Sequence, residues 1–474
     1  MKEWEALVSA ALLGTARRPL DLSELPESVR GLVNGGDPER MLLSAAALLT
    51  GYRRAGRLPE RDVTLLSRAP EDPRPVVGPD AAYRLAMLLF GERGNLLAEW
   101  LRTVHARGLR VPPERLPVLA DAARGRPELR PLVAEAAGPR GPWLAALMPD
   151  WAFLAERSAD PEVWTHGTTN QRHAWLTDLR TPDPDAARAA LAEVWPSEPA
   201  PVRVQFLGAL HTQLSTSDEE FLEAALDDRA RDVRRLAAGL LAALPGSALS
   251  ERMATRLRAL ISIRRRTLVV HLPAACDDAM RRDGVNPTPP RGVGERAWWF
   301  GQLVSTAPLS VWTGLGHPAD ELVRMPVEGC DRRLLILGWS AAADREQNAE
   351  WVRALLDGDT GLALDQVARL ISALPRDQWA TAVRPFLQDQ LPTALVQALP
   401  APWPADLGNL VLDRIASGGA RGLAHVADIA AYAVPPECLD HALTRQVLEH
   451  DAAPWRRRLV DTLAFRRGMH EELP

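Results

Sequence analysis

The sequence predicts an all-α fold built from stacked antiparallel helix pairs. Apolar residues recur at helical spacing through most of the 474 residues. Strand signals are scarce, because the chain holds only three Tyr and seven Phe and shows no sustained alternation of apolar and polar residues. The gaps between helical segments are mostly short and contain Pro, Gly, Asp or Asn. Short helices joined this tightly tend to pack as antiparallel neighbours.

The first predicted helix runs from the N-terminus to about Gly14. One face of it carries, at i, i+3, i+4, i+7 and i+8, the residues Trp4, Leu7, Val8, Ala11 and Leu12. We expect this stripe, Trp4 included, to belong to the core, as for Trp100 and Trp351. A second helix is expected after residues 37–39, because this Asp-Pro-Glu supplies a cap, a first-turn proline and a first-turn acid.

Helix signals continue along the chain. Asn95 is expected to cap a segment with an apolar stripe that Gly108 closes. Similar helices are predicted at about 112–124, 127–137, 170–180 and 183–195.

The clearest unit is residues 217–246, where two apolar helical stripes flank an acidic turn. Asp228 in this turn precedes the pair Val233-Arg234 by five and six residues. The segment resembles a HEAT repeat, in which an Asp and an Arg at that spacing tie successive units together while the Val packs inward. The resemblance implies an irregular HEAT-like α-solenoid.

Away from this unit the repeat pattern weakens. The pair Val202-Arg203 is present in the preceding segment, but Ser197 stands where the Asp would be. No strict period of about 40 to 47 residues runs through the chain, so divergent repeats are expected. A globular helical domain at 1–150 stays open as an alternative. The predicted regions are an N-terminal helical region at 1–150, HEAT-like helical repeats at 151–282, a Pro/Gly-interrupted connecting region at 283–330 and C-terminal helical repeats at 331–474.

Composition narrows the class of protein. The formal net charge of −5 does not indicate a polycation that seeks nucleic acid or anionic lipid. The three cysteines are far apart and form no CxxC pair, which favours a reducing compartment. The N-terminal segment suits an amphipathic helix better than a signal peptide, and no apolar run reaches the roughly 18 to 20 residues of a membrane span. We therefore expect a soluble, cytoplasmic protein without membrane contact.

The sequence contains no recognisable catalytic constellation. Lys2 is the only lysine among 56 basic residues, which excludes a phosphate-binding GxxxxGK[ST] loop, a Schiff-base lysine and a kinase lysine. The ten histidines are scattered, with no HExxH and no Cys/His cluster at ligand spacing. We expect a protein that is not an enzyme, with no cofactor and no metal site.

Arginine clustering is the one functional signal above background. Between residues 252 and 282 the only acids are Asp277 and Asp278. The arginines of this stripe are Arg252, Arg256, Arg258, Arg264, Arg265, Arg266, Arg281 and Arg282. Guanidinium groups bind phosphate and carboxylate bidentately, so the stripe is a candidate for binding nucleic acid or an acidic partner. The more ordinary interpretation is a solvated helix face or ion pairs to the next repeat.

Trp298 and Trp299 are a second candidate site. Adjacent residues on a helix cannot face the same way, so one of the two is expected to be exposed. An exposed tryptophan is a typical anchor for a protein partner.

Three stretches make the chain similar to a known family: ALVSAALLGTARRPL at 6–20, RAWWFGQLVSTAPLSVW at 296–312 and LILGWSAAADREQNAEWVRALL at 335–356. They resemble an uncharacterised, mainly actinobacterial helical family encoded near MoxR-type AAA ATPases, von Willebrand A-domain proteins and SWIM zinc-finger proteins. The resemblance implies a non-catalytic interaction scaffold or accessory subunit in an AAA-ATPase-linked assembly, with an ATPase or A-domain protein as partner. The alternative is a nucleic-acid-binding helical-repeat protein that uses the arginine-rich stripe.

Overall fold

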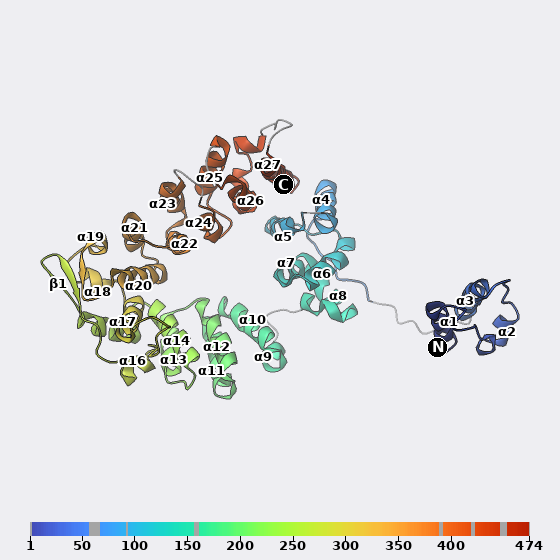
Figure 1. Cartoon of the computed structure of the whole chain (residues 1–474), viewed down its shortest axis with the longest axis horizontal. Helices are drawn as coiled ribbons and strands as arrows, with labels where there is room; N and C mark the ends of the chain where they lie inside the picture. The colour runs from blue at the N-terminus through green and yellow to red at the C-terminus, as the bar shows by residue number, and fades with distance from the viewer. Residues whose placement is uncertain are drawn as a thin grey trace. The chain divides into compact units, whose positions relative to one another are not determined.

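The structure is a computed structural model, and it describes residues 2–55, 67–91, 93–155, 161–387, 392–418, 422–445 and 453–473. The described residues are mostly helical, which confirms the all-α prediction (Figure 1). The chain divides into two compact units, Met1–Ala69 and Pro70–Pro474. None of the described helices is long and apolar enough to cross a lipid bilayer.

Unit 1, Met1–Ala69, is a small helical module. Its elements are α1 (Lys2–Leu13), the 3-10 turn η1 (Leu22–Glu24), α2 (Glu27–Arg30) and α3 (Pro38–Ala55). Gly14, at φ 82°, ends α1 as predicted, because this left-handed conformation suits glycine. The Asp37 carboxylate accepts a hydrogen bond from the Arg40 backbone N–H at 2.8 Å and so caps α3. A core cluster holds the unit together and consists of Leu7, Leu25, Val29, Ala45 and Leu49.

The buried side of α1 differs from the predicted one. Leu7 is buried in the core, whereas Trp4, Val8 and Leu12 are exposed at 37%, 40% and 81%. The helix is apolar on more than one side, so the spacing alone did not identify the side that packs. Trp100 and Trp351 are buried as expected.

Unit 2 begins with a helical segment that has its own core. Its helices are α4 (Pro79–Phe90), α5 (Leu97–Ala106), α6 (Leu116–Arg124), α7 (Arg130–Ala137) and α8 (Gly141–Leu147). Short 3-10 turns lie between them: η2 (Gly94–Leu96), η3 (Pro113–Arg115), η4 (Pro127–Leu129), η5 (Gly138–Arg140) and η6 (Pro149–Leu154). Asn95 lies inside η2 instead of capping α5, but Gly108 follows α5 at φ 63° as the predicted stop.

The remainder of unit 2 continues the helical pattern. Its helices are α9 (Pro161–His166), α10 (Thr169–Arg180), α11 (Pro184–Val194), α12 (Ala200–Gly208), α13 (Glu219–Ala225), α14 (Arg231–Ala243), α15 (Ala248–Arg258), α16 (Asp278–Arg282), α17 (Glu295–Thr306), α18 (Ser310–Thr313), α19 (Ala319–Arg324), α20 (Arg332–Arg345), α21 (Ala349–Asp357), α22 (Leu364–Ser372), α23 (Trp379–Val383), α24 (Thr393–Ala398), α25 (Ala405–Ser417), α26 (Leu423–Ala433) and α27 (Pro454–Glu471). The 3-10 turns are η7 (Trp195–Ser197), η8 (Ala209–His211), η9 (Thr216–Asp218), η10 (Arg376–Gln378), η11 (Arg384–Leu387), η12 (Pro436–Cys438) and η13 (Ala442–Arg445).

Successive helices of this part pack on one another in sequence order. α10 packs on α11 and α12, α12 on α14, α14 on α15, α15 on α17, and α17 on α20. The order continues from α20 through α22, α24 and α26 to α27. One apolar core runs through these helices, from Trp175 on α10 to Leu463 on α27. Each helix therefore buries its apolar face mainly against near neighbours along the chain.

The predicted unit at 217–246 contains the helix pair α13 and α14. Val233 is fully buried. The Asp228 carboxylate accepts a hydrogen bond at Oδ1 from Nη2 of Arg203 on the preceding α12, at 3.2 Å, and its Oδ2 forms an ion pair with Arg203 Nε at 3.1 Å. Arg234 donates from Nη1 to the Asp228 carbonyl oxygen at 2.7 Å. The acidic turn is thus tied both to the preceding helix and to its own pair.

A three-stranded sheet interrupts the helices. This sheet was not predicted from the sequence. β1 (Ile261–Arg264) and β2 (Thr267–Val270) form an antiparallel hairpin, and β3 (Val327–Glu328) lies parallel to β2. The strands are only two to four residues long, too short for an alternating pattern to stand out in the sequence. The predicted connecting region 283–330 holds β3 and α17 to α19, and their apolar side chains belong to the main core.

Helix α27 joins the two cores of unit 2. Its first half packs into the α10–α26 core through Leu459, Val460 and Leu463. Its second half and the residues after it pack into the core of α4–α8 through Phe465, Met469 and Leu473. The C-terminal helix therefore holds together segments that lie more than 350 residues apart in the sequence.

Candidate interaction surfaces

Unit 1 exposes an unusual amount of apolar surface for its size. The exposed large apolar side chains among its described residues are Trp4, Val8, Leu12, Leu13, Leu32, Leu43 and Tyr52. Trp4, Val8 and Leu12 follow one another at i, i+4 and i+8, so they form a continuous stripe along α1. We call these three residues the α1 stripe. Contiguous exposed apolar patches on a protein surface mark interaction sites more often than scattered single residues do.

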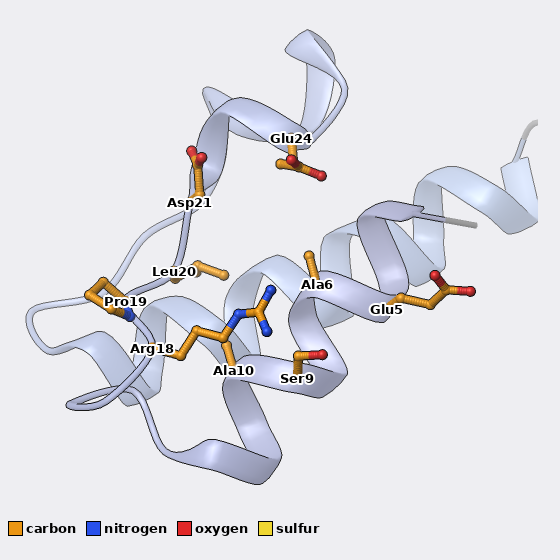
Figure 2. Close-up of a pocket in the computed structure, with 9 residues that line it drawn as sticks. All are labelled: Glu5, Ala6, Ser9, Ala10, Arg18, Pro19, Leu20, Asp21 and Glu24. Atoms are coloured by element: carbon orange, nitrogen blue, oxygen red, sulfur yellow. The ribbon is translucent and has the colours of Figure 1, made fainter.

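A pocket of about 400 Å³ lies beside α1 in the same unit (Figure 2). Arg18, from the loop after the helix, extends its guanidinium over Ser9 and Ala10. Glu5 and Asp21 contribute carboxylates to the lining. The lining is polar and of mixed charge, and it contains neither a histidine nor a cysteine. The residues around it do not form a nucleophile and base pair.

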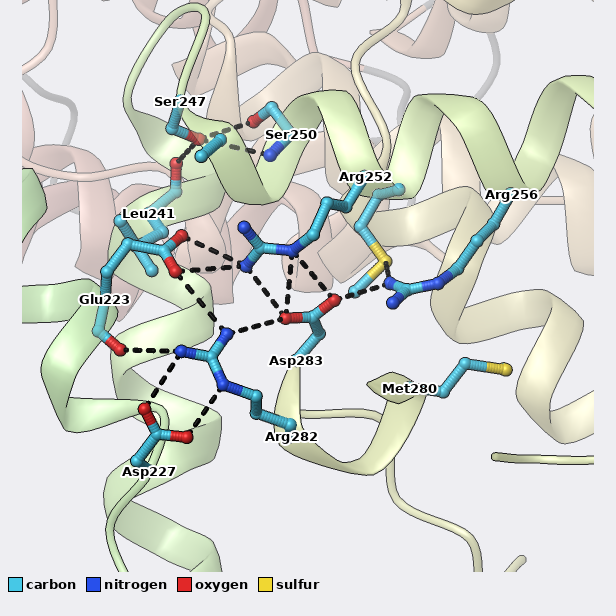
Figure 3. Close-up of polar contacts among 12 residues, drawn as sticks. Glu223, Asp227, Leu241, Ser247, Ser250, Arg252, Arg256, Met280, Arg282 and Asp283 are labelled. Atoms are coloured by element: carbon cyan, nitrogen blue, oxygen red, sulfur yellow. Dashed lines mark hydrogen bonds and ion pairs between the residues drawn. The ribbon is translucent and has the colours of Figure 1, made fainter. Parts of the chain in front are cut away.

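The predicted arginine stripe does not form one surface. Arg252 and Arg256 lie on α15 and Arg282 at the end of α16, where their guanidinium groups surround buried Asp283 (Figure 3). The Arg252 Nη2 lies 2.8 Å and the Arg256 Nη1 2.7 Å from Asp283 carboxylate oxygens. Arg252 also reaches Glu223 on α13 at 3.0 Å.

Arg282 completes this cluster. Its Nε donates to the Asp227 carboxylate at 2.7 Å, and this hydrogen bond lowers the pKa of Asp227 and raises that of Arg282. The three arginines therefore join α13, α15 and α16 by ion pairs. This agrees with the more ordinary interpretation of the stripe, in which its arginines pair with neighbouring elements. The predicted stripe ended at residue 282, one residue before Asp283. Glu223 lies on α13 and Asp227 in the turn after it, both outside the stripe.

The central arginines lie at the tip of the β1–β2 hairpin. Arg264, Arg265 and Arg266 are all exposed, and the only carboxylate near them in the described residues is Glu321, 3.9 Å from Arg266. Arg265 and Arg266 have φ values of 48° and 62°, the combination of a two-residue type I′ turn. This turn normally carries Asn-Gly or Asp-Gly, so two arginines there are strained.

The last two predicted arginines are also exposed. Arg281 pairs with Asp278 on the same helix, with Nη1 to Oδ1 at 2.9 Å. Arg258, at the end of α15, has no ion-pair partner in the described part of the chain. The eight arginines thus divide into a paired cluster, a hairpin tip and two surface residues.

Trp298 and Trp299 turn inward. Trp298 is half-buried and donates its indole N–H to the Asn286 carbonyl oxygen at 2.9 Å. Trp299 is 9% exposed and donates to the Pro287 carbonyl oxygen, also at 2.9 Å. Both side chains hold the Pro- and Gly-rich loop before α17 against the helix. The prediction that one of the two is exposed is therefore wrong, because each indole is held by a backbone carbonyl of that loop.

A groove on unit 2 was not identified from the sequence. It has a volume of about 540 Å³ and lies between α4 and Phe465 of α27. Tyr83, Met87 and Phe90 on α4 line it and are exposed at 71%, 43% and 69%. The signal in the sequence is that α4 is apolar nearly all round, because Ala81, Leu85 and Leu88 occupy its buried side.

The side chains that could bind a metal ion, and the three thiols, can be placed in the described part of the chain. No group of three or more His, Cys, Asp or Glu side chains among them is placed to hold a metal ion. Burial raises the pKa of Cys330 and of Cys438 to about 11, so both thiols stay protonated at neutral pH.

Comparison with known proteins yields one match. The model of a family described as "Family of unknown function (DUF5691)" covers residues 6–473. No curated protein and no solved structure matches the chain.

Proposed function

The chain belongs to this family of unknown function, and we propose that it is a non-catalytic interaction scaffold or accessory subunit that binds protein partners. The α1 stripe, Trp4, Val8 and Leu12, carries the proposal. Unit 1 buries a core cluster of five apolar residues, yet leaves this stripe exposed, partly at Trp4, over which Arg53 lies, and mostly at Leu12. An exposed tryptophan beside aliphatic side chains on one helix is a typical anchor for a partner protein.

The helices from α10 to α27 are the frame in this proposal, an irregular HEAT-like α-solenoid. The sequential packing of helices and the Arg203–Asp228 tie between successive pairs support it. In solenoids each repeat contacts mainly its neighbours and the array offers an extended surface to partners. The family resemblance further suggests a cytoplasmic assembly in which a MoxR-type ATPase or a von Willebrand A-domain protein is the partner.

Binding to these two candidate partners tests the proposal. The purified chain is titrated with each of them, and Leu12→Glu is compared with the wild type. Leu12 is 81% exposed, so the substitution leaves folding intact while it places a charge in the stripe. We expect affinity for one partner to fall at least tenfold.

Leu13→Glu is the matched control. Leu13 is 55% exposed at the same end of α1 but points about 100° away around the helix. It is expected to bind nearly as well as the wild type. The proposal is contradicted if neither candidate partner binds the wild-type chain. It is also contradicted if Leu12→Glu binds a partner as tightly as the wild type does.

A second candidate function is nucleic-acid binding, favoured by the exposed hairpin tip Arg264–Arg266. Three adjacent guanidinium groups with little carboxylate around them suit a phosphate backbone. This candidate predicts DNA or RNA binding that weakens steeply with salt and is lost when the three arginines are changed to Glu. Binding that is absent at low salt eliminates it.

A further inference from the structure

Helix α4 carries an apolar stripe that no described part of unit 2 covers. Tyr83, Met87 and Phe90 recur at i, i+4 and i+7 and face solvent, while the opposite side of α4 is fully packed. A helix that is apolar on both sides is normally buried on both. The exposed side of α4 therefore lacks the partner that its composition calls for.

The surface has both protruding and hollow parts. Tyr83 and Phe90 protrude, whereas Ala86 and Gly91 are small and lie in the groove that Phe465 closes on its far side. A surface whose knobs and hollow lie on the same helix can fit a copy of itself across a two-fold axis. Met87, at its middle, adapts readily to an opposing side chain.

Opposite charges lie at the two ends of the stripe. Asp80, in the first turn of α4, is exposed and has no ion-pair partner among the described residues. Arg93 lines the groove just beyond the C-terminal end of α4. It stacks 4.7 Å from the Phe465 ring centre and donates to the Asp461 carbonyl oxygen, but no described carboxylate pairs with it.

We propose that this face binds a second copy of the chain, with the two α4 helices antiparallel about a two-fold axis between Ala86 and Met87. In this register Tyr83 faces Phe90 of the other copy, and Ala86 faces Met87. The Asp80 carboxylate then meets Arg93 of the other copy at both ends of the interface. This register thus packs the protruding aromatic side chains against each other, fills the hollow at Ala86 and pairs the two charges at each end.

This inference is independent of the partner binding assigned to the α1 stripe. A single helix with its flanking groove is smaller than the roughly 800 Å² per partner of a standard stable interface. The dimer is therefore weak and forms as the protein concentration rises.

Sedimentation velocity of the full chain from low to high micromolar concentration tests the proposal. The expected result is a reversible monomer–dimer equilibrium that the double variant Tyr83→Ser/Phe90→Ser abolishes. Both side chains are about 70% exposed, so the variant is expected to fold and to keep the wild-type melting temperature. Leu12→Ser, on the other unit, is the matched control and is expected to dimerise like the wild type.

Charge reversal tests the register itself. Asp80→Arg and Arg93→Asp each replace two attractive pairs by two repulsive ones, and each is expected to weaken the dimer on the order of tenfold. The combined Asp80→Arg/Arg93→Asp variant restores opposite charges and is expected to regain wild-type affinity. A chain that stays monomeric throughout, or a dimer that Tyr83→Ser/Phe90→Ser leaves unchanged, overturns the proposal. A combined variant weaker than either single one refutes the antiparallel register.

Discussion

Arg466 on α27 holds the carboxylate of Glu99 on α5, with Nε to Oε2 at 2.9 Å. Arg466 is 2% exposed, and its guanidinium also donates to the Ala431 and Val434 carbonyl oxygens at the end of α26. His470 lies 2.8 Å from the same carboxylate. One side chain thus connects the two cores of unit 2, and the docking of α27 depends on its charge being balanced.

Removing the Glu99 charge is therefore expected to destabilise unit 2. Glu99→Gln leaves a buried guanidinium without its counter-ion, at a cost of about 3 kcal/mol in the free energy of unfolding. Urea denaturation followed by circular dichroism measures it. Asp428→Asn is the matched control, because Asp428 on α26 pairs with Arg458 on α27 at 3.5 Å and both side chains are exposed. It should cost less than about 0.5 kcal/mol. If the two variants lose the same free energy of unfolding, the Glu99–Arg466 ion pair contributes no more than an exposed pair, which contradicts the prediction.

The same pair predicts an acid-sensitive step. Burial opposes ionisation of Glu99, but hydrogen bonds from His470 and Arg466 outweigh it and lower the pKa of Glu99. A lowered folded-state pKa gives stability that is fully present above the ordinary Glu pKa of about 4.3 and is lost as the pH falls through the lowered value. The stability difference between wild type and Glu99→Gln should therefore shrink as the pH falls below about 4. A difference that grows on acidification would contradict the assignment.

Arg180 and Asp218 form a second buried ion pair, with both side chains fully buried and Nη2 to Oδ2 at 2.8 Å. Arg180 also donates to the carbonyl oxygens of Pro184, Thr212 and Gln213. A lysine cannot donate to all of these acceptors, because its ammonium is a compact point charge and lacks the planar array of donors of a guanidinium. We expect Arg180→Lys to lower the free energy of unfolding by about 3 kcal/mol.

Arg369→Lys is the control for this substitution. Arg369 pairs with Asp365 one turn earlier at 3.2 Å, and both side chains are exposed. The change should be nearly neutral. If thermal unfolding shows that Arg180→Lys destabilises the protein no more than Arg369→Lys, a lysine can replace the Arg180 guanidinium. The argument from hydrogen-bond geometry then fails.

The sequence predicted the helices because their signals are local. The cap at Asp37 and the stop at Gly14 depend on residues within one turn, and the structure confirms them. Arg180 and Arg466 could not be recognised, because their carboxylates lie 38 and 367 residues away. An arginine-rich chain gives no local indication of which guanidinium groups are buried.

The candidate surfaces show the same limit. Arg252 and Arg282 looked unpaired within their own window, but their partners Glu223 and Asp283 come from other elements or lie just outside it. The α4 stripe was overlooked because its exposure depends on which side of an apolar helix packs. Arg264–Arg266 are the adjacent arginines of the stripe that are all exposed, and there the backbone is a hairpin instead of a helix.

That hairpin gives the last prediction. Arg265 and Arg266 occupy left-handed backbone conformations, each of which costs a non-glycine residue roughly 1 kcal/mol. Asn-Gly is the preferred pair for a type I′ turn, so Arg265→Asn/Arg266→Gly should raise the free energy of unfolding by about 1 kcal/mol. Arg264→Asn is the matched control: it removes one of the three charges at a position with ordinary φ and should not stabilise the protein. A gain of equal size in both variants would mean that relief of charge repulsion, and not of backbone strain, is the cause. Strain kept at an exposed arginine tip is expected where the tip binds something, so the stabilised variant should also lose whatever anionic ligand the wild type retains at low salt.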